Sequence, residues 1–439
     1  MNLRRHFAAH ILVLAILLPQ TQRVQAENWP GWRGPRGDGT SNESNVPTEW
    51  DGASGKNIAW KIEISGTGHS APIVWEDRVF VTTCLQDTGE RLLLCYDRDS
   101  GQERWRRTVV SAPLETKHRL NSYASSTPVT DGTLVYVSFL KVDGSTVPAP
   151  NVGASRPVTP GQILVACYDM QGNFVWSREV GRFVSAHGFC SSPILYDDLM
   201  IINGDHDGDS YIVALEKDSG KTVWDIERIH KTRSYVTPII RRVAGQDQLV
   251  MSGSKRVVSL QPSTGKLIWT IEGPTEQFVA SMVFDGQRFY MCAGFPTYHV
   301  MGIRGDGKGD VTDTHVDWHV TNVRCYVPSP VVIGPYLIVA DDRGTANCFD
   351  TETGKRHWQA RLSTHFSSSL VTAGGLTYLI SDTGETTLLR PGKVVDVVGK
   401  NELGEQVFAS PAISNGRLFI RAEKHLYCIQ SSDSNADGQ

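Results

Sequence analysis

The chain of 439 residues repeats one short pattern about eight times, and this repeat limits its fold more than any other feature. Each copy has a Ser-Pro-like step, an apolar strand, a turn at Asp-Gly or a similar pair, and a second apolar strand. A third strand ends in an apolar-Ala/Cys-apolar-Asp phrase, and a fourth strand with Trp follows a Thr/Ser-Gly turn. Such a four-stranded unit cannot bury its own faces, so the copies must pack against one another.

The copies keep the pattern to different degrees. Residues 348–358 of the sixth copy show it clearly, as Cys-Phe-Asp-Thr-Glu-Thr-Gly-Lys-Arg-His-Trp. The fifth copy replaces its Thr/Ser-Gly turn with a polar loop at 304–315, and the seventh, at 366–402, has no Trp. The eighth copy begins at Ser410 and lacks its fourth strand.

The missing strand is available near the other end of the sequence. Residues 57–62, Asn-Ile-Ala-Trp-Lys-Ile, have the fourth-strand pattern and precede the first copy. Radial closure protects the sheet edges that an open array would expose. The sequence therefore predicts an all-β fold, an eight-bladed β-propeller of four-stranded antiparallel blades, closed by an N-terminal strand that completes the last blade.

One Trp in most copies is interpreted as packing between blades, because a large ring fills the wedge between adjacent sheets. The spacings are 40–49 residues, apart from one of 71 that contains an insertion at 142–161, predicted to be a long surface loop. The residues in this position are Trp60, Trp105, Trp176, Trp224, Trp269, Trp318 and Trp358.

The first 26 residues are typical of a secretory signal peptide. Arg4 and Arg5 precede an apolar run at 7–18, and small residues stand at the expected cleavage site. The run is shorter than the ~20 residues that a membrane-spanning helix needs, so we expect no transmembrane span after cleavage and a periplasmic or secreted protein. The predicted organisation is a signal peptide at 1–26, an N-terminal extension at 27–56, the propeller at 57–430 and a disordered tail at 431–439.

The net charge and the positions of the cysteines argue against nucleic-acid binding and against a zinc site. The formal charge of −4 provides no basic field for nucleic acid. The eight cysteines show no zinc-ligand spacing, and half of them occupy the Ala/Cys place of the repeat, so most are predicted to be free and buried.

The phrase at 348–358 resembles the tryptophan-docking repeat of the pyrroloquinoline-quinone-like propellers, and the resemblance extends over roughly 55–430. That family includes quinoprotein alcohol dehydrogenases and non-catalytic outer-membrane assembly lipoproteins, both eight-bladed. Residues 29–35, Trp-Pro-Gly-Trp-Arg-Gly-Pro, are similar to a group of exported bacterial proteins without an established activity. The dehydrogenases typically place a vicinal Cys-Cys pair over the quinone, a Trp beneath it and a calcium-linked Asp nearby, and this sequence has no Cys-Cys pair.

In a propeller, the residues just before the Ser-Pro-like steps converge at one mouth of the central channel. Here they are rich in aromatic and ionisable side chains, which either plug the channel or bind a planar anion or a peptide segment. The candidate ligand-binding residues are His69, Tyr123, His187, Tyr235, Arg324, Tyr326, His365 and Phe408.

A weak metal candidate lies at Asp205, Asp207 and Asp209, which begin like an EF-hand loop. The sixth position holds Ser210 instead of Gly, and a strand is predicted at 211–216, so the segment cannot wrap around a cation. No metal site is therefore predicted.

These observations favour an exported, non-catalytic propeller that acts as a binding or protein-interaction scaffold in the cell envelope. The expected partners are envelope proteins or peptide segments, and the expected state is a monomer without a cofactor. The alternative is an oxidoreductase that uses pyrroloquinoline quinone with calcium. A hydrolase is unsupported, because no Gly-x-Ser-x-Gly elbow occurs.

Overall fold

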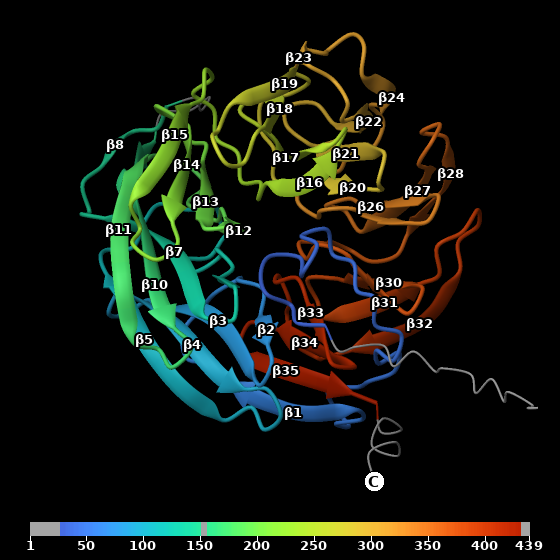
Figure 1. Ribbon diagram of the computed structural model, residues 1–439. Coiled ribbons are helices and arrows are strands. Elements are labelled where there is room, and N and C mark those ends of the chain that lie inside the picture. The colour runs from blue at the N-terminus through green and yellow to red at the C-terminus, as the bar shows by residue number, and fades with distance from the viewer. Residues whose placement is uncertain (1–26, 151–155, 432–439) are drawn as a thin grey trace, which may run out of the picture.

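A computed structural model describes residues 27–150 and 156–431, which form a ring of eight β-sheets around a central axis (Figure 1). The predicted signal peptide and all but the first residue of the predicted tail lie outside the described residues. Within the described ranges, no helix has the length and apolar character needed to cross a membrane. The predicted eight-bladed all-β propeller is confirmed.

The first four blades follow the order of the chain. Blade one contains β2 (Ile73–Trp75), β3 (Arg78–Leu85), β4 (Glu90–Asp97) and β5 (Glu103–Ser111). Blade two contains β6 (Val129–Thr130), β7 (Leu134–Val142), β10 (Gly161–Asp169) and β11 (Phe174–Phe183). Blade three contains β12 (Ile194–Tyr196), β13 (Leu199–Gly204), β14 (Tyr211–Glu216) and β15 (Thr222–Glu227). Blade four contains β16 (Ile239–Val243), β17 (Gln246–Gly253), β18 (Arg256–Leu260), β19 (Leu267–Glu272) and the added β23 (Gly309–Asp310).

The remaining blades complete the ring. Blade five contains β20 (Val283–Phe284), β21 (Arg288–Ala293), β22 (His299–Arg304) and β24 (Val316–Val320). Blade six contains β25 (Val331–Ile333), β26 (Tyr336–Ala340), β27 (Thr345–Asp350) and β28 (Arg356–Arg361). Blade seven contains β29 (Val371–Ala373), β30 (Leu376–Ile380), β31 (Glu385–Leu389) and β32 (Val397–Glu402). Blade eight contains β33 (Ala412–Ser414), β34 (Arg417–Arg421), β35 (His425–Gln430) and β1 (Ile58–Glu63).

The ring closes through β1, which pairs antiparallel with β35 as the fourth strand of blade eight. Trp60 lies opposite Cys428, and Glu63 lies opposite His425. Figure 1 shows the two strands side by side, although one begins and the other ends the propeller. The predicted closure is therefore confirmed, with β1 beginning at Ile58 instead of residue 57.

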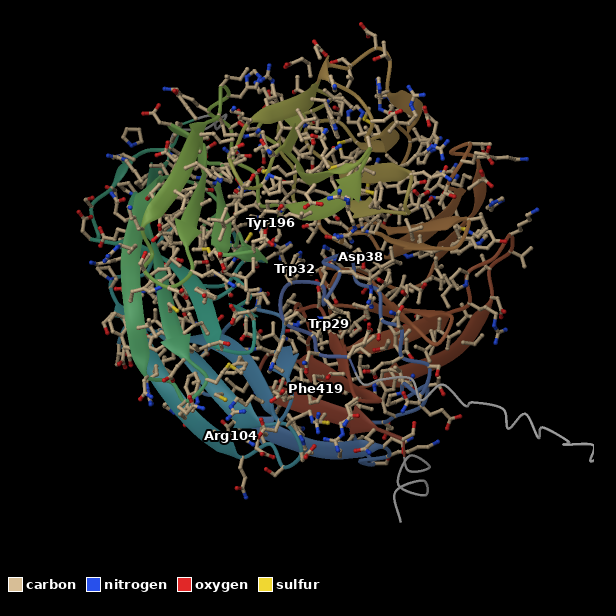
Figure 2. All side chains as sticks on the ribbon, in the orientation of Figure 1. Trp29, Trp32, Asp38, Arg104, Tyr196 and Phe419 are labelled. Carbon is tan, nitrogen blue, oxygen red and sulfur yellow. The ribbon has the colours of Figure 1, made fainter. Side chains whose placement is uncertain are left out.

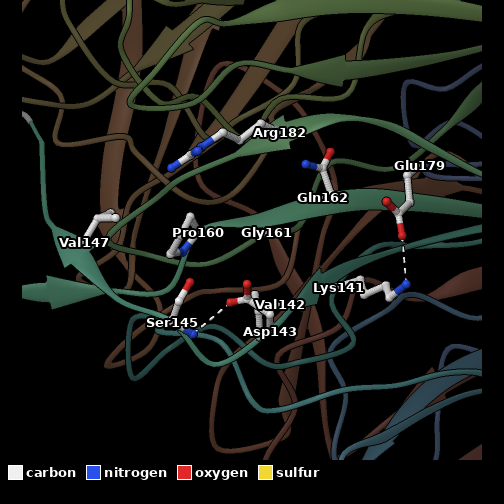
Figure 3. Close-up of a pocket in the computed structure, with 10 residues that line it drawn as sticks. All are labelled: Lys141, Val142, Asp143, Ser145, Val147, Pro160, Gly161, Gln162, Glu179 and Arg182. Atoms are coloured by element: carbon white, nitrogen blue, oxygen red, sulfur yellow. Dashed lines mark hydrogen bonds and ion pairs between the residues drawn. The ribbon is translucent and has the colours of Figure 1, made fainter.

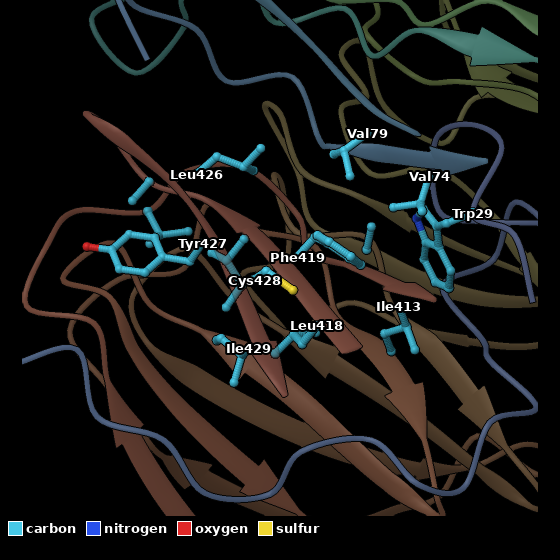
Figure 4. Packing of buried hydrophobic residues seen from close by; sticks show 14 of the residues in the cluster. Trp29, Val74, Val79, Ile413, Leu418, Phe419, Leu426, Tyr427, Cys428 and Ile429 are labelled. Atoms are coloured by element: carbon cyan, nitrogen blue, oxygen red, sulfur yellow. The ribbon is translucent and has the colours of Figure 1, made fainter. Parts of the chain in front are cut away.

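The position of a strand within its blade determines its pattern of burial. The third strand β4 has six consecutive buried residues because adjacent blades cover both of its faces. The outer strand β5 is mostly exposed and alternates along much of its length, as expected where one face meets solvent. The core is accordingly a series of apolar layers between blades, and Figure 4 shows the layer that includes Phe419, Cys428 and Ile429.

The Trp of one blade docks on a glycine turn of the next. Trp105 donates a hydrogen bond from Nε1 to the Met170 carbonyl at 3.1 Å. Gly172, with φ of +80°, lies so close that a Cβ atom there would be 2.7 Å from the Trp105 ring. The same arrangement joins Trp60 with Gly101, Trp176 with Gly220, Trp224 with Gly265, and Trp318 with Gly354. The glycine therefore provides both a left-handed turn and the space for the ring.

Blade four shows what happens where the next copy lacks this turn. Trp269 donates to the Gln248 Oε1 atom at 2.8 Å, within its own blade. The polar loop of the degenerate fifth copy provides β23, which pairs parallel with β19 as a fifth strand. The loop thus covers the outer edge of blade four at β19.

The insertion in blade two is only partly a loop. Residues 142–161 were predicted to form a long surface loop, and their described part includes two short paired strands, β8 (Val147–Pro148) and β9 (Pro157–Val158). In this pair Val147 lies opposite Val158, and Pro148 lies opposite Pro157.

All eight cysteines are free, and all but the half-buried Cys190 are buried. The predicted free and buried state is confirmed for most of them. Cys292 and Cys325 lie next to each other, and the contact with Cys325 raises the pKa of the Cys292 thiol.

Candidate functional site

Residues 27–56, called the strap below, close one end of the central channel. The fully buried Trp29 exchanges two backbone hydrogen bonds of 2.8 Å with Val74 on the first strand of blade one. Across the ring, Arg33 donates from Nη2 to the Pro330 carbonyl at 2.5 Å, and Arg241 donates to the Asp38 carboxylate at 2.7 Å. The strap therefore ties blades from opposite sides of the ring.

Trp32 projects from the strap into the channel. Figure 2 places it near the centre of the ring, and its Nε1 atom donates to the Ser281 hydroxyl at 3.3 Å. Trp32 also borders a small cavity of about 100 Å³ within the channel. The channel therefore has a floor formed by the strap.

A girdle of hydroxyl groups surrounds the channel at the Ser-Pro-like steps. Each hydroxyl accepts a hydrogen bond from the backbone N–H of the preceding blade, at 2.9–3.1 Å. The acceptors are Thr127, Ser192, Ser281, Ser329, Ser369 and Ser410. The repeat places Ser or Thr here because the short inner strands need a bond between neighbouring blades.

Above the girdle, at the mouth opposite the strap, lies a cavity of about 350 Å³, called the cup below. Loops from all eight blades contribute to it. Its lining residues are His69, His118, Leu120, Asn121, Ser125, His187, Cys190, Tyr235, Val279, Tyr326, Val327, Asp342, His365, Ser367 and Phe408.

The structure brings together six of the eight candidate residues predicted from the sequence: His69, His187, Tyr235, Tyr326, His365 and Phe408. Tyr123 does not line the cup, because its ring lies under the Lys117 ammonium at 5.0 Å instead. Arg324 is exposed and does not line the cup either. These two residues are therefore not among those that line the cup, because the segment before each step is irregular and its neighbouring side chains differ in burial.

Several residues of this site were not predicted from the sequence, among them four with ionisable, thiol or aromatic side chains. His118 and Asp342 come from other parts of their loops, and Cys190 lies two residues before its Ser-Pro step. Trp32 comes from the strap, whose packing the repeat does not determine. A sequence feature could have indicated Asp342. The pair Asp341-Asp342 directly follows the second strand of its copy, at the end of the blade where the cup lies.

Aromatic pairs and hydrogen bonds order the wall of the cup. The His69 and Phe408 rings lie 4.7 Å apart, and His187 stacks on Tyr235 at 6.1 Å. The Tyr235 hydroxyl is bonded to Ser185 at 2.9 Å. These pairs hold the rings in fixed positions around the cavity.

Burial changes the ionisation of the cup residues. It lowers the pKa of His187 to about 4, with Arg233 adding to the effect, so this imidazole is neutral near pH 7. It raises the pKa of Asp342 to about 6 and that of the Cys190 thiol to about 12. Asp342 is therefore mostly ionised near pH 7, while the thiol is protonated.

The acidic segment in blade three is bound by arginines. Asp205 accepts from Arg228 at 3.0 Å, and Asp207 accepts twice from Arg233 at 2.8 Å. Asp209, which is exposed, pairs with a lysine. Within the described ranges, no group of three or more His, Cys, Asp or Glu side chains is arranged to hold a metal ion.

Another hollow lies on the outside of blade two, beside the insertion (Figure 3). It measures about 370 Å³, and the Lys141 ammonium and Glu179 carboxylate in it form an exposed ion pair at 2.8 Å. Exposed pairs of this kind bind weakly and are screened by salt. The cup is the better candidate site, because its polar groups converge in a largely buried cavity.

The cup does not fit the quinone of the dehydrogenases. That cofactor carries several carboxylates, whereas the lining has no Lys or Arg and its ionised group is itself a carboxylate, Asp342. Arg324, the arginine among the candidate residues, is exposed and is not one of the lining residues. The described residues thus lack both the charge and the cysteine pair that this cofactor would require.

Comparisons with known proteins agree with this architecture. A search of curated proteins finds no similar sequence. Among solved structures, BamB from Moraxella catarrhalis matches with a TM-score of 0.59 and 13% identity, over 85% of this chain and 97% of that one. A europium-containing methanol dehydrogenase matches with a TM-score of 0.49 and 14% identity, over 92% of this chain and 98% of that one.

The model of one protein family matches residues 40–147, 145–294 and 313–391, which together make up well over half of the sequence. These segments cover most of the propeller, including five of the glycine turns and the loops that form most of the cup. The chain belongs to the family described as outer membrane protein assembly factor BamB, the PQQ_2 propellers.

Proposed function

We propose that this protein is an exported, non-catalytic binding propeller that acts as an interaction scaffold in the cell envelope. The observation that carries the proposal is the cup: rings from several blades converge on a cavity whose floor is closed by Trp32. A blind cavity of this size suits a ligand or a short protein segment that enters from one side. Membership of the BamB family supports a role in assembly rather than chemistry.

The charges of the cup also favour binding over catalysis by the quinone. The cavity lining has no Lys or Arg for an anionic cofactor, and the Cys190 thiol is held protonated by burial, so it is a poor nucleophile. Loops from every blade surround the mouth, and loops of this kind carry binding surfaces in many scaffolds.

The test is affinity purification of the mature protein from an envelope extract, compared with a Tyr326→Ala variant whose fold is checked by circular dichroism. We expect one reproducible set of partners with the wild type and its loss with the variant. A second arm adds pyrroloquinoline quinone and calcium and follows absorbance and dye reduction. Quinone uptake with alcohol-dependent turnover would overturn the proposal, as would partner recovery that is identical with the cup variant.

A further inference from the structure

The cup contains an acidic group without a basic partner. Asp342 is the lining residue with a carboxylate, and it lies in the turn between β26 and β27. One carboxylate oxygen accepts a hydrogen bond from the Val327 amide at 2.9 Å. Among the described residues, no Lys, Arg or His forms an ion pair with it. A largely buried carboxylate without a counter-ion is costly, so the site gains from a cation supplied by a ligand.

The other carboxylates next to the cup differ in this respect. Asp382 lies 2.7 Å from the His365 imidazole and accepts bonds from Ser367. Glu423 lies 3.7 Å from His69, and this contact lowers the pKa of Glu423. Both therefore have a histidine within 4 Å, whereas Asp342 faces the cavity and, in the part of the chain that the structure describes, has no such close partner, although His365 acts on it from farther away.

The rings around the cavity present aromatic surface rather than hydroxyl groups. The Tyr326 hydroxyl donates to the Gln277 Oε1 atom at 3.1 Å, and the Tyr235 hydroxyl is bonded to Ser185. Phe408 adds a third ring on the other side of the cup. The faces of such rings attract organic cations, and several rings together form the aromatic cages that bind ammonium groups.

Two basic residues near the cup, Arg233 and Lys117, have partners of their own. The Arg233 guanidinium forms two hydrogen bonds with the Asp207 carboxylate, both of 2.8 Å. The Lys117 ammonium lies over the Tyr123 ring at 5.0 Å, outside the lining. Neither supplies Asp342 with a counter-charge.

We propose that the cup binds an organic ammonium group, with Asp342 as its counter-ion and Tyr235, Tyr326 and Phe408 as its aromatic wall. This inference rests on the proposed binding function and names its ligand class. The ammonium group belongs either to a free small amine or to a lysine side chain of a partner protein. The cavity of about 350 Å³ accommodates either source.

Isothermal titration calorimetry of the mature protein near neutral pH tests this inference. The probes are choline, its uncharged carbon isostere neohexyl alcohol, and N-acetyl-lysinamide. We expect at least one cationic probe to bind about tenfold more tightly than neohexyl alcohol. Preference for choline would indicate a free amine, and preference for N-acetyl-lysinamide would indicate a lysine of a partner.

Two variants of the cup and one control separate charge from shape. Asp342→Asn should weaken cation binding about tenfold and leave neohexyl alcohol unaffected, and Phe408→Leu should weaken cation binding while keeping an apolar side chain. Glu352→Gln removes one negative charge at the other end of β27 and should change nothing. Thermal unfolding of each variant establishes that it is folded.

The inference would be overturned if neither cationic probe bound more tightly than neohexyl alcohol, and also if cation binding were unchanged in Asp342→Asn. The absence of binding by both cationic probes would overturn it as well. None of these results affects partner retention by the cup, which the affinity purification measures independently. The two proposals can therefore fail separately.

Discussion

Trp50 of the strap stacks on Tyr378 of blade seven, with ring centroids 6.5 Å apart and planes inclined by 8°. In blade six, the docking residue Trp358 lies opposite Cys348, but in blade seven the matching place opposite Leu388 is taken by Gly399. Trp50 is only 3% exposed, and its backbone N–H donates to the Asn401 Oδ1 atom at 2.8 Å. The strap thus supplies the large ring that the seventh copy lacks.

Replacing Trp50 by Ala should destabilise the propeller as strongly as truncation of a core Trp. We expect a loss of about 3–5 kcal/mol in the free energy of unfolding, measured with a chemical denaturant, because the ring leaves a cavity next to Tyr378. The control is Phe174→Ala on the outer strand β11, where the ring is 61% exposed. That change should stay within about 0.5 kcal/mol, and an equally small effect at Trp50 would show that the strap only covers the blade.

The glycine turns should be sensitive to a single methyl group where they meet a Trp ring. Gly354 has φ of +68°, and a Cβ atom there would lie 2.5 Å from the Trp318 ring. Gly375 has a similar φ of +76° but no atom within 4 Å of such a Cβ. Both Ala variants carry the strain of a left-handed residue, about 1 kcal/mol, and only Gly354→Ala adds a clash.

Thermal melts of the two variants compare them directly. Gly354→Ala should have the lower melting temperature. We expect it to lose about 1–3 kcal/mol more of the free energy of unfolding than Gly375→Ala loses. Equal melting temperatures would mean that the Trp ring moves aside without cost, contrary to the docking observed here.

The thiols should be unreactive in the folded protein. Burial raises the pKa of Cys84 to about 11 and that of Cys95 to about 12, so almost no thiolate is present near neutral pH. Titration with a chromogenic disulfide reagent should detect little reaction in native protein and eight thiols after denaturation without reductant. A lower count in the denatured protein would indicate a disulfide and contradict the free state of all eight.

The repeat predicted the ring, because each copy keeps a strand order, a turn and a Trp that local chemistry determines. The strap could not be predicted in this way. It occurs once, and its contacts with Val74, Pro330 and Tyr378 join residues that are remote in sequence. The role of Gly172 against Trp105 was missed for a similar reason, since the sequence shows the turn but not the ring that packs on it.

The cup was predicted in outline, because the position of a residue before the inner strand determines which mouth it lies near. Side-chain direction in these irregular loops depends on contacts across blades, so Arg324 was assigned to the cavity and Asp342 was not. That exchange changes the charge of the site from basic to acidic. The sequence had suggested a planar anion or a peptide segment as the ligand, and the acidic group is the basis of the proposed organic cation.

Asp342 should make the free protein less stable as the pH rises through the range in which this carboxyl group ionises. Burial raises its folded-state pKa from an ordinary 3.8 to about 6, while Asp341 adds to the shift and His365 opposes it. The folded state therefore holds this proton more tightly than the unfolded state, and stability from this group is greatest at low pH and declines between about pH 4 and pH 6.

Asp342→Asn should remove this penalty and stabilise the free protein near pH 7 by at most about 3 kcal/mol, with little effect near pH 4. Denaturant unfolding of the wild type and the variant at both pH values measures the difference. A saturating organic ammonium should reverse the order near pH 7, because it stabilises the folded wild type and binds the variant weakly. If the variant without ligand is less stable than the wild type at both pH values, then Asp342 stabilises the fold through its hydrogen bond with Val327. Its role would then be structural rather than cation binding.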